Sequence, residues 1–181
     1  MVHHVIWKRV PDHGIEYCEV TFGAAMRIKG NLICANDNGR FSVQYTVLCD
    51  QDGSTRQVEV RVQQEQGHTT LNVERDHLNR WTLNGLELSE LNGIKDIDIG
   101  VTPATNLLPI HRLKLEVGQS AQFDAAWIRF PELTLQPMKQ QYERVGANTY
   151  IYKSIESGYT AKVYVDANGI VTDYEGEWQQ V

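Results

Sequence analysis

Two aspartates separated by one residue, Asp96 and Asp98, are the side chains in this sequence whose type and spacing most readily suggest chemistry. In a strand over residues 96–99 both carboxylates point to one face, about 7 Å apart, because a strand rises about 3.3 Å per residue and alternates its faces. Like charges that close raise one pKa, which suits general acid-base catalysis. Carboxylate oxygens also bind hard cations, but no Asp-rich loop with the required glycine surrounds this pair. The third interpretation, which the pattern favours, is that the pair anchors Arg112 and the turn over 102–106.

The chain between these carboxylates and Arg112 is predicted to kink twice. Thr102-Pro103 and Leu108-Pro109 break any ladder, since proline donates no backbone hydrogen bond and holds the preceding residue extended. Asn106 lies between the two kinks. After the second kink, polar and apolar residues alternate over 110–117, which predicts a half-buried strand with a basic face.

A second constellation follows the predicted strand over 121–130. Trp127 would share a face with Arg129, and Gln141, Tyr142 and Arg144 come shortly afterwards. A flat aromatic face with a few fixed polar donors is typical of small-molecule sites. The structural alternative remains open: Trp127 would be core and Tyr142 would tether a chain end by its hydroxyl.

Several familiar sites are not predicted. The sequence contains no phosphate loop, no nucleophile elbow and no zinc-binding HExxH, so it names no catalytic residue, metal ligand or cofactor. Cys18, Cys34 and Cys49 match no CxxC arrangement and lie in alternating or apolar stretches. We predict that they are buried free thiols.

Composition limits the partners. The 181 residues carry 17 Lys and Arg against 23 Asp and Glu, a net charge of -6, which argues against nucleic acid or an anionic membrane as the main partner. The longest apolar run near the N-terminus is Val5-Ile6-Trp7, too short for a signal peptide, and no window is apolar enough for an integral membrane segment. We therefore expect a cytoplasmic protein; its oligomeric state is not predicted.

Strand patterns dominate the chain and predict an all-β fold. Stretches rich in β-branched and aromatic residues alternate with turns such as Asn84-Gly85. So many strands must curl into a barrel or split into two packed curved sheets of an antiparallel meander, with at most one or two short helices. The predicted strands cover residues 15–22, 24–34, 41–49, 56–64, 69–75, 96–99, 110–117, 121–130, 149–155, 159–165 and 170–174.

Two segments remain ambiguous. Residues 86–95 suit one helical turn or a short strand pair, and they mark the boundary if the single domain over 1–181 divides into two β subdomains. Residues 137–145 begin with a proline and fit a short helix or a strand equally well.

The chain also resembles a known family. An Asp-x-Asp strand followed by Thr-Pro-x-Thr-Asn and Leu-Pro-Ile, at residues 96–110, is similar to the signature of the "putative glycolipid-binding" family. The resemblance covers nearly the whole chain, with departures at Gly53 and at His111. It implies a curved β fold similar to periplasmic lipoprotein carriers and an amphiphilic ligand, a glycolipid or a fatty-acyl compound. Further matching segments include Trp7, Gly14-Ile15-Glu16, residues 45–50, Trp81, Trp127 with Pro131, residues 141–144 and Trp178.

Two functional hypotheses follow. In the first, a non-enzymatic binding protein encloses an acyl chain in its apolar interior and holds the polar head at a polar rim. In the second, a small hydrolase or lyase uses Asp96 or Asp98 as general base and Arg112 or His111 to stabilise negative charge. The candidate ligand-binding residues are Asp96, Asp98, Thr102, Asn106, Arg112, Trp127, Gln141, Tyr142 and Arg144.

Overall fold

The computed structural model describes residues 1–37 and 39–181 and is built almost entirely of β-strands. This confirms the predicted all-β class. No helix in the described ranges is long and apolar enough to cross a membrane. The strands are β1 (Val2–Arg9), β2 (His13–Thr21), β3 (Arg27–Asn36), β4 (Gly39–Cys49), β5 (Thr55–Gln64), β6 (Gly67–Arg75), β7 (Trp81–Leu83), β8 (Leu86–Glu87), β9 (Asp96–Ile99), β10 (Ser120–Arg129), β11 (Thr134–Gly146), β12 (Thr149–Ser154), β13 (Thr160–Val165), β14 (Val171–Tyr174) and β15 (Trp178–Gln180).

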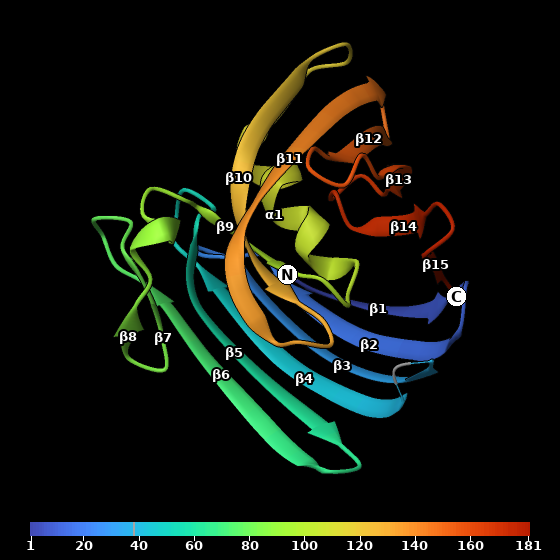
Figure 1. Cartoon of the computed structure of the whole chain (residues 1–181). Helices are drawn as coiled ribbons and strands as arrows, with labels where there is room; N and C mark the ends of the chain where they lie inside the picture. The colour runs from blue at the N-terminus through green and yellow to red at the C-terminus, as the bar shows by residue number, and fades with distance from the viewer. Residues whose placement is uncertain (38) are drawn as a thin grey trace.

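One strongly curved sheet contains all of these strands (Figure 1). Strands β1 to β8 form one antiparallel meander and β15 back to β10 form a second, and the two meanders join where β1 pairs with β15. Strand β9 extends the second meander by pairing in parallel with β10. The sheet is not strictly closed, because β8 and β9 lie at its two ends. A hydrogen bond of 2.8 Å from the Thr55 backbone N–H to the Lys95 carbonyl nevertheless brings the start of β9 against β5.

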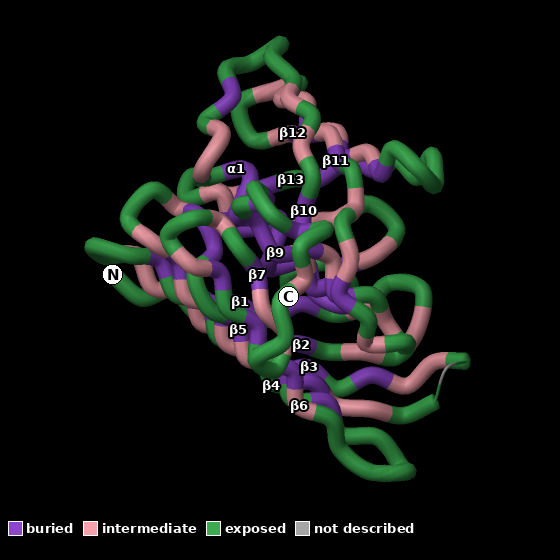
Figure 2. Tube along the Cα trace, turned by 60° about the vertical axis from the view of Figure 1, so that its left-hand side comes forward, coloured by how far each residue is buried: buried purple, intermediate pink, exposed green. Residues whose placement is uncertain are grey.

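The alternation of residue types explains how one sheet can bury its concave side. Strand β3 is exposed and buried at alternate positions, with Ile28 and Leu32 inward and Lys29 and Ile33 outward. Burial of such an inward row is the main favourable term for a sheet of this kind. The buried residues accordingly form a continuous interior in Figure 2.

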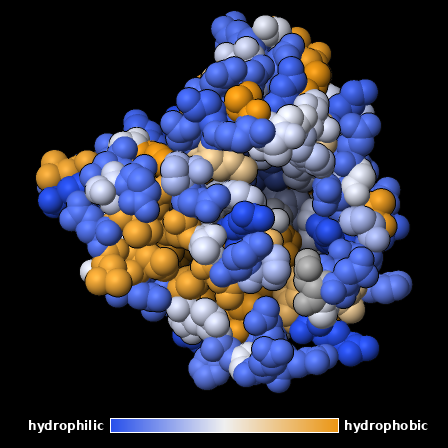
Figure 3. Space-filling model, viewed as in Figure 1, coloured by the Kyte–Doolittle hydropathy of each residue, from blue (hydrophilic) through white to orange (hydrophobic). Residues whose placement is uncertain are grey.

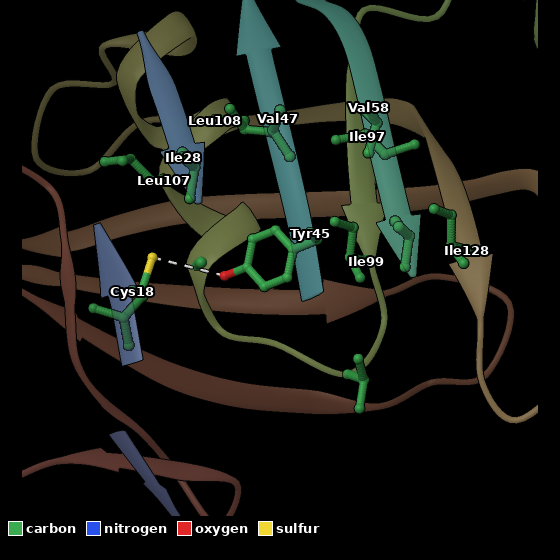
Figure 4. Packing of buried hydrophobic residues seen from close by; sticks show 14 of the residues in the cluster. Cys18, Ile28, Tyr45, Val47, Val58, Ile97, Ile99, Leu107, Leu108 and Ile128 are labelled. Atoms are coloured by element: carbon green, nitrogen blue, oxygen red, sulfur yellow. Dashed lines mark hydrogen bonds between the residues drawn. The ribbon is translucent and has the colours of Figure 1, made fainter. Parts of the chain in front are cut away.

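Strands β9 to β11 divide this interior into two regions. Ile97, Ile99 and Ile128 pack with Val47 and Val58 of the first meander (Figure 4). The opposite face of the same strands carries Asp96, Asp98, Gln140 and Tyr142 toward the second meander. The two faces of β9 are therefore separated as predicted: the isoleucines pack in the apolar interior and the aspartates lie on the opposite side.

The segment after the second predicted kink is not the strand that the sequence predicted. Residues 110–117 were expected to form a strand with a basic face, but α1 (Leu107–Leu113) is a helix that follows the 3-10 turn η2 (Ala104–Asn106). Pro109 lies in the first turn of α1, where its missing N–H costs no hydrogen bond. The helix ends at Lys114, which has a left-handed φ of 48°. The parallel pairing of β9 with β10 requires a crossover connection of this kind, which alternation alone does not reveal.

The remaining assignments are resolved. Residues 137–145 belong to strand β11, which excludes the helix considered for them. Within 86–95 both expected forms occur: β8 pairs with β7, and the 3-10 helix η1 (Ser89–Leu91) follows. Strand β1 was missed, although Trp7 is fully buried in it.

Candidate functional site

A cavity of about 400 Å³ lies on the aspartate face of β9 to β11. The space-filling view shows its opening as the dark hollow right of centre, between β11 and β14 (Figure 3). Its deep wall is polar, with Thr102, Asn106 and Ser154 all under 9% exposed. Its rim includes the exposed Glu156 and Ser157. A hollow of this size with convergent polar groups is typical of a small-molecule site.

Asp98 reaches the cavity from β9, beside its cross-strand partner Trp127. Gln140 donates a hydrogen bond of 2.5 Å to Asp98 Oδ2. Burial raises the pKa of Asp98 to about 6, although the hydrogen bonds from Gln140 and Thr105 oppose this shift. Asp98 is therefore mostly charged at neutral pH and is an acceptor toward the cavity.

Behind Thr102 lies a buried polar cluster formed by Glu16, Tyr45 and Thr102. The Thr102 hydroxyl donates to Glu16 Oε1 at 2.8 Å, and the Tyr45 hydroxyl donates to the same oxygen. Glu16 Oε2 is buried and has no partner among the described residues. Burial raises the pKa of Glu16 to about 7, against the lowering effect of these two hydrogen bonds.

The fold makes room for Tyr45 at one glycine. A Cβ at Gly30 would lie only 2.2 Å from Tyr45 Cζ, so the aromatic ring lies directly across β3. In Figure 4 the Tyr45 hydroxyl points toward Cys18, 3.7 Å from its sulfur. Burial raises the pKa of the Cys18 thiol, which together with the burial of Cys34 and Cys49 confirms the prediction of buried free cysteines.

Asn106 links the cavity to α1 and β11. Its Nδ2 donates to the Pro103 carbonyl at 2.9 Å, while its Oδ1 accepts a hydrogen bond of 2.5 Å from the Tyr142 hydroxyl. Tyr142 is therefore a tether, as the structural alternative predicted, and its pKa is raised well above 10 by burial. Both side chains are held in fixed positions beside Asp98.

Tyrosines form the wall that faces Asp98. The ring of Tyr152 lies 6.1 Å from that of Tyr174 and 6.2 Å from that of Tyr159, in steeply angled pairs. Burial raises the pKa of both Tyr152 and Tyr174, and the nearby charge of Asp98 adds to each shift. All three tyrosines line the cavity.

One arginine is fixed at the rim. Arg9 donates from Nε and Nη2 to the two carboxylate oxygens of Asp12, both at 3.1 Å, and from Nη1 to Glu177 at 3.1 Å. Its guanidinium also lies 5.1 Å from the centre of the Trp178 ring. Gly14 allows this crossing, because a Cβ there would lie 2.5 Å from Arg9 Cγ. The charge of Arg9 is thus already compensated by protein carboxylates.

Asp96 is bound by an arginine of the protein, whereas Asp98 lines the cavity. Arg112 donates to both of its oxygens, from Nε at 3.0 Å and from Nη2 at 2.5 Å, and the Asp96 residue is only 1% exposed. This is the ion pair that the sequence pattern favoured. Arg112 and His111 line a separate hollow of about 760 Å³ at the other end of α1. Of the pairs that the hydrolase hypothesis allows, the structure brings together Arg112 and Asp96, in this ion pair, whereas His111 and Arg112 line a different hollow from Asp98.

The nine candidate ligand-binding residues lie in four different places. Asp98, Thr102, Asn106 and Trp127 line the cavity. Asp96 and Tyr142 lie directly behind it. Gln141 points to the opposite face of β11, where it bonds to Gln122, and Arg112 and Arg144 line the separate hollow. Arg144 donates to the carbonyls of Leu115, Gly146 and Ala147.

Sequence reasoning missed several cavity residues. The three tyrosines come from three separate segments, and nothing local in the sequence brings them together. Arg9 and Trp178 meet only because β1 pairs with β15. Glu16 offered a usable signal, since it occupies an inward position of the alternating β2, in register with Cys18 and Val20. No group of three or more His, Cys, Asp or Glu in the described ranges is arranged to hold a metal ion.

Comparisons with known proteins agree with this architecture. A family model described as "putative glycolipid-binding" matches residues 4–180. A crystal structure of a DUF1089 family protein from Pseudomonas aeruginosa is 30% identical, with a TM-score of 0.83 over 92% of each chain. A beta-barrel-like protein of domain of unknown function DUF1849 from Brucella abortus has 13% identity and a TM-score of 0.59, over 99% of this chain and 95% of that one, which shows the fold alone. A search of curated proteins finds no significant match.

Proposed function

This chain belongs to the family described as "putative glycolipid-binding", and from that membership together with the cavity we propose that it is a non-enzymatic binding protein for an amphiphile, a glycolipid or a fatty-acyl compound. The observation that carries the proposal is the cavity of about 400 Å³, which lies beside the buried apolar interior and is lined by both polar and aromatic side chains. Binding sites for small molecules combine apolar walls with a few fixed polar groups, and this cavity has both.

The placement of the polar residues suggests how the ligand lies. Thr102 and Asn106 are buried at the deep wall and the half-buried Asp98 lines the same cavity, whereas Met138 and Pro137 line it beside the aromatic side chains. We propose that the polar head enters first and that the acyl chain lies along the aromatic wall toward the opening. This orientation reverses the rim position that the sequence hypothesis gave the head. Asp98 and Asn106 are the proposed head-group contacts, and Trp127 contacts the apolar part.

The test begins with the protein as it is expressed. Purification without detergent, followed by native mass spectrometry and organic extraction, should reveal a bound amphiphile. Calorimetric titration with decyl maltoside, below its micelle concentration, should show saturable binding at one site. A protein that is empty and takes up no amphiphile would refute the proposal.

A matched pair of variants localises the binding. Trp127→Ala removes part of the cavity wall, and we expect about ten-fold weaker binding, because an aromatic contact contributes about 0.5–1.5 kcal/mol beyond the area that it buries and ten-fold corresponds to about 1.4 kcal/mol. Asp124→Ala changes the exposed opposite face of the same strand and should leave the affinity unchanged. Equal affinities in the two variants would place the site elsewhere.

A further inference from the structure

The charges around the cavity point to the chemistry of the head group. Three carboxylates line it, from Asp98, Glu156 and Glu177. Arg9 is the cation among the lining residues that the structure describes, and Asp12 and Glu177 already neutralise it. Arg112, Lys114 and Arg144 line the separate hollow instead. The field inside the cavity is therefore negative, which disfavours a phosphate, sulfate or carboxylate head.

The aromatic residues supply a second, independent feature. The π-face of an aromatic ring attracts cations, and cages of such rings recognise ammonium groups. The protein's own cations already occupy two tryptophan faces at this cavity, Arg9 on Trp178 at 5.1 Å and Arg129 on Trp127 at 5.8 Å. The rings of Tyr152, Tyr159 and Tyr174 carry no such contact with a protein cation among the described residues. Tyr159 and Tyr174 pack at steep angles around Tyr152, and all three line the cavity.

Resting on the proposed function, we infer that the preferred ligand carries a protonated amine in its head, held between the Asp98 carboxylate and the wall formed by Tyr152, Tyr159 and Tyr174. The carboxylate supplies the counter-charge and the rings supply the cation–π surface. Asn106 lies at the polar deep wall of the cavity, and its side-chain bonds to Tyr142 and Pro103 keep it in a fixed position there. An amino sugar or a simple amine lipid has this chemistry.

Three amphiphiles with one tail test the inference. Decylammonium, decyl maltoside and decyl sulfate are titrated separately into the intact protein by calorimetry, each below its micelle concentration. The expected order of affinity is cationic, then neutral, then anionic, with at least about ten-fold between the first and the last for one favourable charge contact. An anionic or neutral head that binds as tightly as the cationic one overturns the inference and leaves the proposed function standing. If none of the three binds, the proposed function itself fails.

Variants assign the effect to the named groups. Asp98→Asn keeps the shape and removes the charge, so it should weaken binding of decylammonium about ten-fold and should weaken binding of the uncharged decyl maltoside by a clearly smaller factor. Tyr152→Phe keeps the ring face and should retain cation binding, whereas Tyr152→Leu should lose it selectively. Asp124→Asn on the outer face is the charge-matched control. Equal losses for Asp98→Asn and Asp124→Asn would contradict the inference, as would retention of cation binding in Tyr152→Leu.

Discussion

The guanidinium of Arg112 holds the carboxylate of Asp96 through both Nε, at 3.0 Å, and Nη2, at 2.5 Å. This pair connects the last turn of α1 to the edge strand β9, and it explains why two aspartates so close in sequence differ in role. Asp96 is used to fix the helix, whereas Asp98 is left facing the cavity. The separation of these roles can be tested directly.

Arg112→Ala should destabilise the fold strongly without removing the binding site. The substitution leaves the Asp96 charge buried without its partner, for which a loss of about 3–5 kcal/mol is typical. The double variant Arg112→Leu with Asp96→Leu should recover much of that loss, because no charge then remains buried. Urea denaturation measures both values. Losses that simply add, with no coupling between the two positions, would contradict the ion pair.

A buried glycine offers a test of packing at the Glu16 cluster. Gly30→Ala would place a methyl group on the ring of Tyr45, so we expect a loss of about 1–3 kcal/mol from overpacking. The same substitution in a Tyr45→Ala background should cost much less, because the clashing ring is gone. A double-mutant cycle by chemical denaturation gives the coupling energy. An equal cost in both backgrounds would mean that the backbone at residue 30, rather than the ring, requires glycine.

Much of this architecture was accessible from sequence, and the exceptions have physical causes. Alternation identified most strands and the opposite faces of Asp98 and Ile97, because the two-residue period is a local property of a strand. It failed over residues 110–117, where the first four residues belong to helix α1 and the rest form no strand. The need for a crossover between the parallel strands β9 and β10 decides the structure there. The ion pair of Asp96 with Arg112 was predictable because opposite charges in a half-buried segment usually satisfy each other.

The cavity itself was not predictable. Its tyrosine wall depends on which strands pair late in the chain, and its rim depends on β1 meeting β15. Such long-range pairings are set by the closure of the whole sheet rather than by any local pattern. The Glu16 position carried a signal, a charged residue on an inward face, but only the structure shows that Tyr45 and Thr102 satisfy one of its oxygens and leave the other without a partner among the described residues.

Glu16 should make the protein less stable as the pH rises. Its native pKa is about 7 against an ordinary value of 4.5, so the native state binds a proton more tightly than the unfolded chain between these values. The stabilising contribution is complete below pH 4.5 and is lost by the time the pH passes 7, for a total of roughly 3 kcal/mol. Glu16→Gln should flatten this dependence. Unfolding free energies at several pH values from 4 to 8 provide the comparison.

The exposed Glu74 on β6 supplies the control for that experiment. Glu74→Gln should follow the wild-type pH dependence, because an exposed carboxyl changes its environment little on unfolding. If the Glu16→Gln and Glu74→Gln profiles coincide, Glu16 does not bind its proton more tightly in the native state.

At the end of α1 we predict a stabilising substitution. Lys114 has a φ of 48°, a left-handed conformation that glycine adopts without steric cost. Lys114→Gly should therefore raise the free energy of unfolding by about 0.5–1 kcal/mol. Lys114→Ala keeps the same strain and should bring no such gain. A melting temperature that rises equally in both variants would show that loss of the charge, rather than relief of the backbone, is responsible.

Asp98→Asn should raise the free energy of unfolding at pH 7.5 and weaken the binding of a cationic amphiphile. Burial raises the native pKa of Asp98 to about 6 from an ordinary value of 3.8, so its ionised form costs the folded state up to about 3 kcal/mol above pH 6. The asparagine variant should be more stable at pH 7.5 and no more stable at pH 3.5, where both states hold the proton. Its affinity for a cationic amphiphile should fall in the same pH 7.5 sample. A charged residue that lowers stability at a cavity wall is expected where binding needs its charge. Lower stability of Asp98→Asn at pH 7.5 would instead make Asp98 a structural acceptor for Gln140.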